Sequence, residues 1–310
     1  MDNMRIYVAG HRGLVGSAIT RAIDTAGDHT WLGKTRSELD LLERKAVFEF
    51  LASENPDAVI IAAAKVGGIH ANNTYPVQFL SENLQIEANL MDAAHAAGIR
   101  KLLFLGSSCV YPKMAQQPIK EEYLLTGELE KTNEAYALAK ISGLKLVQAY
   151  RNQYEHDWIS AMPTNMYGPG DNFDLENSHV LPALIRKFDD AKSSGAASVV
   201  LWGSGTPRRE FLHSDDLGRA CVYLLENYND EVAINVGVGE DVSIKELAQI
   251  IRETIGFSGT IEWDSSKPDG TPRKLLDVSR INELGWKAQV SLKDGIASTY
   301  EWYKSNRRLS

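Results

Sequence analysis

The sequence predicts a doubly wound α/β fold, in which helices cover both faces of a parallel sheet, with a smaller α/β domain toward the C-terminus. Three observations predict it. Apolar runs of strand length show no alternation with polar residues, helix-length segments separate these runs, and a glycine-rich turn follows the first of them. A strand that is apolar throughout needs cover on both faces, as in a parallel sheet between two helix layers.

The expected strands and helices alternate through the first half of the chain. Helical segments separate the apolar runs RIYVA, HTWLG, AVIIAAA, KLLFLG and WISAMP. We expect these strands at residues 5–9, 29–33, 58–64, 101–106 and 158–163, and helices at residues 14–26, 43–53, 76–97 and 133–154. The repeated order of strand and helix predicts crossover connections and hence parallel pairing.

The character of the sequence changes after Pro163. The segment TNMYGPGDNF is dense in Gly, Pro, Asn and Asp, which predicts a loop. We then expect a helix at 180–194, a strand at 198–203, a further strand of the main sheet at 231–237 and an amphipathic helix at 243–256. We therefore predict a first domain over residues 1–165, with a return segment at about 211–238, and a second domain mostly over residues 166–310.

Composition and charge argue against several classes of partner. The 310 residues carry a formal net charge of −8, which is unfavourable for binding nucleic acid or an anionic membrane. No segment approaches the roughly 18 apolar residues that span a bilayer, and the N-terminus leads into a strand without a secretory signal. We expect a cytoplasmic protein without a metal site. Cys109 and Cys221 give no disulfide framework, and Cys221 reads as a structural residue in the apolar helix GRACVYLL.

The glycine-rich turn AGHRGLVGSAI joins the first strand to the first helix. Gly10 allows the tight turn, Gly13 lets the backbone approach a diphosphate, and Gly16 lets helix and strand pack closely. The free N–H groups and the dipole at the start of the helix favour phosphate. In this strand–turn–helix context the turn predicts a Rossmann-type dinucleotide site rather than only a tight connection.

The end of the second strand distinguishes the two nicotinamide cofactors. NAD sites usually place an acid there for the ribose 2′-hydroxyl, whereas LGKTRSELDL has Lys34 and Arg36 before its first acid, Glu38. A guanidinium forms charge-assisted hydrogen bonds with the 2′-phosphate of NADP, and Arg12 offers a second clamp. We therefore expect NADP(H) as the cofactor, although a single arginine is also common on a solvated surface.

A tyrosine and a lysine share one face of the helix NEAYALAKISG. Tyr136 and Lys140 are four residues apart, which places both side chains on the same side. We expect the lysine to lower the pKa of the tyrosine, so that the phenol serves as a general acid near neutral pH. Ser107, in GSSCVYP at the end of the fourth strand, can donate to the same substrate oxygen. The spacing of four arises easily by chance, but chance does not account for its place after a glycine turn and a strand-end serine.

The glycine turn, Ser107, Tyr136 and Lys140 together resemble the extended short-chain dehydrogenase/reductase family. Blocks over nearly the whole chain further resemble the GDP-L-fucose synthase family: AGHRGLVGSAI, AAAKVGGIHANNTYP, FLGSSCVYP, MPTNMYGP, NSHVLPALI, WGSGTPRREFLH and SKPDGTPRKLLDVSR. The resemblance implies an NADPH-dependent enzyme that epimerises C3 and C5 of the nucleotide sugar GDP-4-keto-6-deoxy-D-mannose and then reduces C4. It also implies a homodimer joined by a four-helix bundle, for which the helices at about 76–97 and 134–154 are the candidates.

The resemblance implies a role for each catalytic residue. Cys109 is the base and His179, in NSHV, is the acid of the epimerisation, because inversion beside a ketone needs a base and an acid on opposite faces. Ser107 and Tyr136 hold the enolate oxygen, Tyr136 then protonates O4, and Lys140 also holds the nicotinamide ribose. Without the resemblance, Cys109 reads as a buried core residue.

The resemblance also implies two sets of binding residues. The substrate set places Lys187 and Arg209 on the diphosphate and Trp202 on the nucleotide, and it includes Asp269. Arg208 competes with Arg209 for the diphosphate, a lysine at 187 lacks the fork of an arginine, and Asp269 also fits a plain Pro-Asp-Gly turn. The cofactor set is Gly10, His11, Arg12, Gly13, Leu14, Val15, Gly16, Arg36, Leu105, Gly106, Ser107, Ser108, Lys140, Pro163, Thr164, Asn165, Met166 and His179.

Other functions on the same fold remain open. A 4-epimerase or a 4,6-dehydratase of the superfamily recycles a bound cofactor, but it usually has an acid in the region of Arg36 or of Cys109. A non-catalytic regulator that senses NADP typically lacks the tyrosine and lysine that this chain keeps. Consumption of NADPH with a keto sugar distinguishes the enzyme from the regulator.

Overall fold

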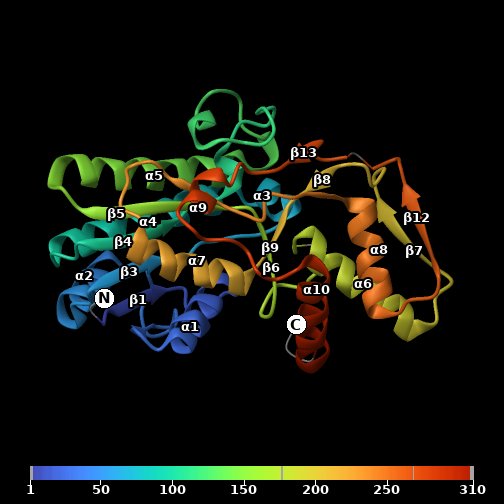
Figure 1. The fold of residues 1–310 in the computed structure, drawn as a ribbon, viewed down its shortest axis with the longest axis horizontal. Helices are drawn as coiled ribbons and strands as arrows, with labels where there is room; N and C mark the ends of the chain where they lie inside the picture. The colour runs from blue at the N-terminus through green and yellow to red at the C-terminus, as the bar shows by residue number, and fades with distance from the viewer. Residues whose placement is uncertain (1–2, 176, 268, 308–310) are drawn as a thin grey trace.

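The computed structural model describes residues 3–175, 177–267 and 269–307, and its centre is a six-stranded sheet (Figure 1). The strands are β1 (Arg5–Ala9), β2 (Thr30–Leu32), β3 (Ala58–Ile61), β4 (Lys101–Leu105), β5 (Asp157–Pro163) and β10 (Ile234–Val236). Their order is β10-β5-β4-β3-β1-β2, and every neighbouring pair is parallel. Val8, Ile60, Leu103 and Ile159 stand side by side across four strands, and all are buried. The predicted parallel sheet is therefore confirmed.

Helices cover both faces of this sheet. They are α1 (Leu14–Ala26), α2 (Arg44–Glu54), α4 (Pro76–Ala96), α5 (Glu134–Tyr154) and α7 (Ser214–Asn227). Helices α4 and α5 pack against each other with α2 beside α4, whereas α1 packs against α7 (Figure 1). Strands β4 and β5 lie between α5 and α7, so the two groups of helices occupy opposite faces.

A second apolar core lies in the later part of the chain. Strands β7 and β12 pair in parallel, helix α6 packs against β7, and helix α8 contacts both α6 and α10 (Figure 1). Ile185, Phe188, Leu247 and Ile251 are among its fully buried side chains. The amphipathic helix predicted at 243–256 is confirmed as α8. The bounds are α6 (Val180–Ser194), β7 (Ser198–Trp202), α8 (Ile244–Ile255), β12 (Thr260–Asp264) and α10 (Leu292–Asn306).

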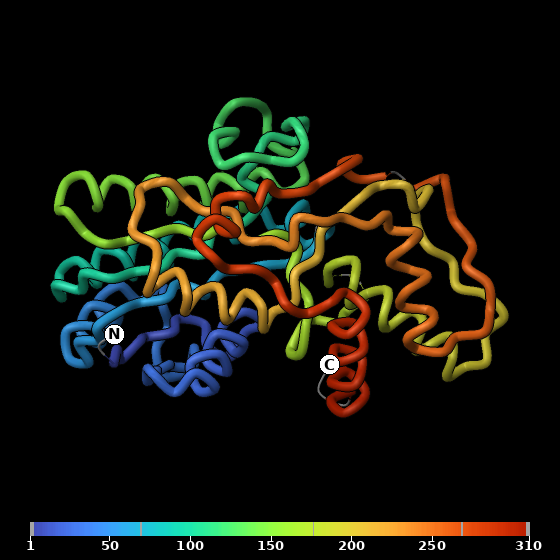
Figure 2. Tube along the Cα trace, viewed as in Figure 1, coloured from blue at the N-terminus to red at the C-terminus, as the bar shows by residue number. Residues whose placement is uncertain are grey.

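Late segments of the chain run back beside the first half, as the orange parts of the tube in Figure 2 show. Strand β10 joins the edge of the central sheet next to β5, as the sequence predicts for residues 231–237. Short elements line the region between the two cores, where β6 pairs with β9 and β8 lies between β11 and β13. They are β6 (Asn165–Tyr167), β8 (Arg208–Arg209), β9 (Phe211–His213), β11 (Val242–Ser243), β13 (Arg273–Lys274) and α9 (Ser279–Glu283).

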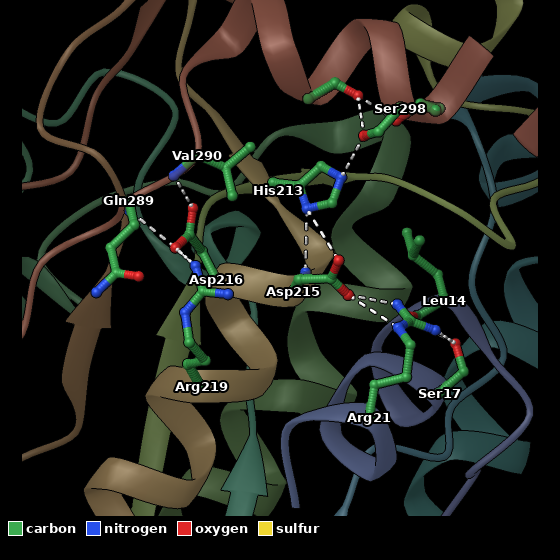
Figure 3. A network of polar contacts seen from close by, with 12 residues as sticks. Leu14, Ser17, Arg21, His213, Asp215, Asp216, Arg219, Gln289, Val290 and Ser298 are labelled. Carbon is green, nitrogen blue, oxygen red and sulfur yellow. Dashed lines mark hydrogen bonds and ion pairs between the residues drawn. The ribbon is translucent and has the colours of Figure 1, made fainter. Parts of the chain in front are cut away.

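A polar network ties the first helix to the later part of the chain (Figure 3). The guanidinium of Arg21 on α1 binds the carboxylate of Asp215 at the start of α7. The next residue, Asp216, accepts hydrogen bonds from the backbone N–H groups of Gln289 (2.8 Å) and Val290 (2.9 Å). The N-terminus of α7 is therefore a junction between the helix after the glycine turn and the segment that leads into α10.

The structure differs from the sequence-based expectations in several elements. The segment TNMYGPGDNF was expected to be a loop, yet its residues 165–167 form β6, because they pair with β9. The third strand ends at Ile61 rather than at residue 64, and a short helix, α3 (Ile69–Thr74), follows it. Helix α10 was not expected. In the described part of the chain no helix is long and apolar enough to cross a membrane.

Candidate active site

The glycine turn between β1 and α1 forms an open cradle of backbone. Gly10 has a φ of +85°, and a Cβ there would lie 2.8 Å from the Cα of Ala63. A Cβ on Gly16 would collide with the backbone of Gly10, so both positions require glycine for close approach. A Cβ at Gly13 would have the carbonyl oxygen of Gly10 at 3.4 Å as its nearest neighbour among the described residues, and Gly13 is exposed. The turn therefore leaves room for a ligand group above Gly13, where α1 starts without a side-chain cap.

His11, Leu14 and Val15 complete the turn. The imidazole of His11 packs 5.8 Å from the ring of Trp31, and a Cβ on Gly33 would lie 2.5 Å from its Nδ1. Burial, followed by the charge of Arg12, lowers the pKa of His11, which favours the neutral ring. The buried Nδ1 has no hydrogen-bond partner among the described residues.

Basic side chains gather at the end of β2. Arg12 and Arg36 are both exposed, and Arg36 pairs with Asp40 at 3.5 Å. The first acid after the strand, Glu38, accepts hydrogen bonds from the backbone N–H (2.7 Å) and hydroxyl (2.6 Å) of Thr35. These hydrogen bonds lower the pKa of Glu38, with smaller contributions from Lys34 and Arg12. The Glu38 carboxylate is therefore hydrogen-bonded within its own loop, and the guanidinium groups of Arg12 and Arg36 are exposed beside it.

Ser107 and Cys109 lie together where β4 ends. Leu105 is the last residue of the strand, the Gly106 N–H donates to the carbonyl of Ala161 (2.9 Å), and a 3₁₀ turn, η1 (Ser108–Val110), follows. Ser107 caps this turn by accepting the Cys109 N–H, and the Cys109 thiol donates to the Ser107 hydroxyl at 3.1 Å. The turn thus holds the sulfur beside the hydroxyl.

The two cysteines lie in different surroundings. Cys221 belongs to the main apolar core, and burial raises the pKa of its thiol. Cys109 is also largely buried, but it is not among the members of either apolar cluster in the described chain. The prediction that Cys221 is structural is confirmed. Cys109 therefore differs from Cys221 in its surroundings, and its catalytic role stays a prediction.

Tyr136 and Lys140 lie one turn apart on α5. The Lys140 ammonium donates to the carbonyl of Leu105 (2.9 Å) and lies 5.9 Å from the centre of the Tyr136 ring. Burial, then Cys109 and then Glu87, raise the pKa of Tyr136 well above its usual value. The expectation that this pKa is lowered is wrong, because burial of the phenol is the largest effect and raises it. The Lys140 ammonium is itself paired with Glu87 at 3.2 Å.

The segment after β5 is held by backbone contacts. The Thr164 N–H donates to the carbonyl of Val236 (3.0 Å), and the Asn165 amide donates to the carbonyl of Glu210 (2.8 Å). Met166 then pairs with Leu212 in the β6–β9 ladder. These contacts hold the four residues from Pro163 to Met166 at the carboxyl end of the sheet, next to Ser107, which follows the neighbouring strand β4. Gly10 lies at the same end of the sheet, after β1.

His179 occupies the N-terminus of α6. The loop before it is tied to the turn after β3, because the Gly68 N–H donates to the carbonyl of Asn177 (2.8 Å). The imidazole is accessible to solvent, and desolvation by the surrounding protein together with the charge of Lys274 lowers the pKa of His179. Lys274 also interacts electrostatically with Cys109. One cation therefore acts on both candidate groups of the epimerisation.

A second group of predicted residues gathers around Trp202 at the end of β7. The exposed indole has two ammonium groups over its ring, from Lys187 and Lys267, each 5.5 Å from the ring centre. Asp269 accepts hydrogen bonds from the backbone N–H (2.9 Å) and hydroxyl (2.7 Å) of Ser204, which lower its pKa. Trp202 is therefore a surface residue rather than part of the second core, and Asp269 fixes the adjacent turn.

The two neighbouring arginines have different partners. Arg208 binds the carboxylate of Asp241 at 2.8 Å and pairs with Glu246 at 3.4 Å. Arg209 donates to the carbonyl of Arg208 (2.8 Å) and has no carboxylate partner among the described residues. Burial lowers the pKa of Arg209. Of the two, Arg209 is the one that still needs an anion.

Three residues of these groups were missed in the sequence. Glu87 contacts Lys140, Lys267 lies over Trp202, and Lys274 acts on Cys109 and His179. Glu87 is a single acid within a long helix, and the two lysines belong to the block SKPDGTPRKLL that was noted only for Asp269. Glu87 could have been noticed in the sequence, because it is a charged residue at a position where the helix must face the sheet.

The cradle and the hydroxyl, phenol and ammonium groups at the carboxyl ends of parallel strands define a dinucleotide-dependent enzyme of Rossmann type. The sequence matches the NAD dependent epimerase/dehydratase family over residues 6–237. The chain belongs to this family.

Individual relatives show which proteins of this family the chain is similar to. The chain is 58% identical to the putative GDP-L-fucose synthase 2 of Arabidopsis thaliana over 302 residues, which cover 97% of this chain and 92% of that protein. It is 54% identical to the GDP-L-fucose synthase of Escherichia coli over 316 residues, covering 99% and 98%. The solved GDP-mannoheptose C4 reductase of Campylobacter jejuni, with NADP bound, is 39% identical with a TM-score of 0.90, and the match covers 97% of this chain and 98% of that one.

Proposed function

We propose that this protein converts GDP-4-keto-6-deoxy-D-mannose to GDP-L-fucose, by epimerisation at C3 and C5 followed by NADPH-dependent reduction at C4. The observation that carries the proposal is the Cys109 thiol, held 3.1 Å from the Ser107 hydroxyl at the end of β4. A reductase that leaves C3 and C5 untouched needs no base there. The high identity to relatives named GDP-L-fucose synthase supports the same activity.

In the epimerisation, each group moves or holds one proton. The Cys109 thiolate removes the proton from the carbon beside the ketone, and His179 returns one to the opposite face. Ser107 and Tyr136 donate hydrogen bonds to the oxygen on which negative charge develops, as in an oxyanion hole. Lys274 places a positive charge that interacts electrostatically with Cys109 on this side of the site.

In the reduction, Tyr136 supplies the proton. Its raised pKa keeps the phenol protonated at neutral pH, so it can donate to O4 as negative charge arrives there. NADPH supplies the hydride to C4 when it is bound. Lys140 lies behind the tyrosine and would also hold the nicotinamide ribose.

The residues of the glycine turn fit the cofactor. The open space above Gly13 suits a diphosphate, and the buried Nδ1 of His11 still needs a partner. Arg12 and Arg36 suit the 2′-phosphate, because Glu38 is turned to Thr35. The remaining members of the set are Gly10, Leu14, Val15, Gly16, Leu105, Gly106, Ser107, Ser108, Lys140, Pro163, Thr164, Asn165, Met166 and His179.

For the substrate, we assign Arg209 rather than Arg208 to the diphosphate. Arg208 is already paired with Asp241 and Glu246, whereas Arg209 has no carboxylate partner among the described residues. Lys187 gives a second positive charge, and the exposed Trp202 offers an apolar face to the nucleotide. Asp269 contacts the substrate from the turn that it fixes through Ser204.

We assign cofactor binding to residues 1–165 with the return segment at about 211–238, and substrate binding mostly to residues 166–310. Two separate apolar cores support this division. We also propose a homodimer through α4 and α5, since Val77 on α4 and Leu138 on α5 expose apolar side chains. Light scattering after size-exclusion chromatography tests the dimer. Action in the cytoplasm suits the two free cysteines.

The experiment follows NADPH absorbance with freshly made GDP-4-keto-6-deoxy-D-mannose and identifies the product by chromatography. We expect NADPH consumption with GDP-L-fucose as the product. A product that keeps its C3 and C5 configuration would make the protein a plain C4 reductase, as the Campylobacter jejuni relative is named. Binding of NADP without any consumption would contradict both.

A further inference from the structure

A buried ion pair between α4 and α5 lies behind the proposed proton donor. The Glu87 carboxylate of α4 is 3.2 Å from the Lys140 ammonium of α5, and their side chains are only 2% and 3% exposed. The same ammonium donates to the carbonyl of Leu105 (2.9 Å) and lies 4.6 Å from the centre of the Phe104 ring. Lys140 is thus contacted by a carboxylate, a carbonyl and an aromatic ring, and of these three contacts in the described chain only Glu87 carries a negative charge.

The residues packed around Glu87 leave space for its carboxylate. Gly143 lies one turn after Lys140, and a Cβ there would be 2.7 Å from Oε2 of Glu87 and 2.5 Å from the Phe104 ring. Apart from Lys140, neither carboxylate oxygen has a polar partner in the described residues. The absence of a side chain at Gly143 therefore makes room for a carboxylate whose one polar neighbour is the lysine.

Stability alone does not account for this pair. Removing two charges from water costs about as much as their attraction returns, and well-packed apolar residues commonly replace such pairs without loss. Desolvation raises the pKa of Glu87, and Lys140 opposes this shift. The pair therefore needs a further reason, and its position next to Tyr136 provides one.

The charges that face Tyr136 come from three elements. Lys140 lies on its own helix, Glu87 comes from α4, and Cys109 comes from the turn after β4. A lone ammonium behind a phenol stabilises the phenolate. With Glu87 paired to it, the net charge behind Tyr136 is close to zero, and the phenol keeps its proton. Reduction of a ketone needs the protonated form, because the tyrosine must donate.

We propose that Glu87 is the counter-ion of Lys140, that it fixes the ammonium behind Tyr136, and that it keeps Tyr136 in its proton-donating form. Glu87 is buried and acts through Lys140 and Tyr136, so it is a positioning residue. The inference deepens the proposed function and rests on the role of Tyr136 in it.

The test is an ultraviolet titration of the Tyr136 phenolate in the protein without substrate or cofactor. The parent curve is the protein minus its Tyr136→Phe variant, so the other tyrosines cancel. The second curve is Glu87→Gln minus Glu87→Gln/Tyr136→Phe. Glu87 is one of the charges that raise the pKa of Tyr136, so its removal should lower the midpoint by roughly 1–2 pH units. A parent that unfolds before Tyr136 titrates still gives a lower limit for comparison.

A matched control lies on the same pair of helices. Asp92 of α4 accepts a hydrogen bond from the hydroxyl of Tyr150 on α5 (2.6 Å) and pairs with Arg44 (2.7 Å). Asp92→Asn loosens the helix contact away from Lys140 and should leave the Tyr136 midpoint in place. An unchanged midpoint in folded Glu87→Gln, or an equal shift in Asp92→Asn, would overturn the proposal.

A double variant covers the case in which Glu87→Gln does not fold. Glu87→Gln/Lys140→Gln removes both charges, so no buried ammonium is left unpaired. Recovery of the fold in the double variant supports the ion pair, and failure of both variants overturns it in favour of a purely packing role.

Turnover provides a second readout. The alkaline limb of kcat for NADPH oxidation should move to lower pH in Glu87→Gln by the same amount as the titration midpoint, with little change in KM. If the protein does not turn over the keto sugar at all, the proposed function fails while the titration still reports on Glu87. The two failures are therefore distinguishable.

Discussion

Two adjacent aspartates at the start of α7 should differ strongly in their contribution to stability. Asp216 is completely buried, accepts the N–H groups of Gln289 and Val290, and pairs with Arg219 (Figure 3). Asp216→Ala removes a fully buried carboxylate and leaves the backbone N–H groups of Gln289 and Val290 without their acceptor. A hydrogen bond to a charged group contributes roughly 1.5–3 kcal/mol, so the two together give an expected loss of about 3–6 kcal/mol in the free energy of unfolding.

Asp215 supplies the matched control. Its ion pair with Arg21 measures 2.5 Å, but the two side chains are 36% and 44% exposed. Water screens such a pair, so Asp215→Ala should cost less than about 1 kcal/mol. Urea unfolding followed by circular dichroism measures both values. Equal losses in the two variants, or a loss under about 1 kcal/mol for Asp216→Ala, would refute the argument that burial decides the magnitude.

The other predictions concern the site and its pH dependence. Cys109→Ser should lose solvent-deuterium incorporation at C3 and C5 while still oxidising NADPH with simpler ketone analogues; full incorporation would remove Cys109 as the base. Arg209→Ala should raise KM for the nucleotide sugar roughly 10- to 100-fold, because a charge-assisted contact is lost, and an equal rise in Arg208→Ala would contradict the assignment. Burial raises the pKa of Asp171 from 3.8 to about 7, so the folded protein binds a proton more tightly than the unfolded chain, and stability should fall as pH rises from about 4 to 7. Asp171→Asn keeps the Oδ1 that accepts the Asn172 N–H (2.8 Å). Its free energy of unfolding should exceed that of the parent by roughly 2 kcal/mol at about pH 8 and equal it near pH 4. Urea unfolding midpoints at both pH values check this, and a gain that does not depend on pH would contradict it.

The central sheet could be predicted from the sequence because its signal is local. The strands at RIYVA and KLLFL are buried and without polar alternation after a first basic residue, and helix-length segments separate the strands along the chain. The small sheet of β8, β11 and β13 could not be predicted from the sequence. Each of its strands has two residues, which is too short for any period, and their partners are far apart in the chain. Pairing of such strands depends on the assembled fold.

In the candidate site, too, the local features could be predicted and the contacts between distant segments could not. A spacing of four on one helix predicted that Tyr136 and Lys140 share a face, and the structure places them one turn apart. The partner of the lysine was not predicted. Glu87 lies on another helix, and only the packing of α4 against α5 brings the two together. The pKa of Tyr136 therefore depends on burial and on contacts between helices, and a spacing of four along one helix reveals neither of them.

The most direct test of the account is one reaction run in deuterated water with NADPH and GDP-4-keto-6-deoxy-D-mannose. Nuclear magnetic resonance of the purified product reports both configuration and isotope at each carbon. The account predicts GDP-L-fucose that carries deuterium at C3 and at C5, because Cys109 and His179 exchange both protons with solvent before reduction at C4. A reduced product with hydrogen retained at both positions would contradict it.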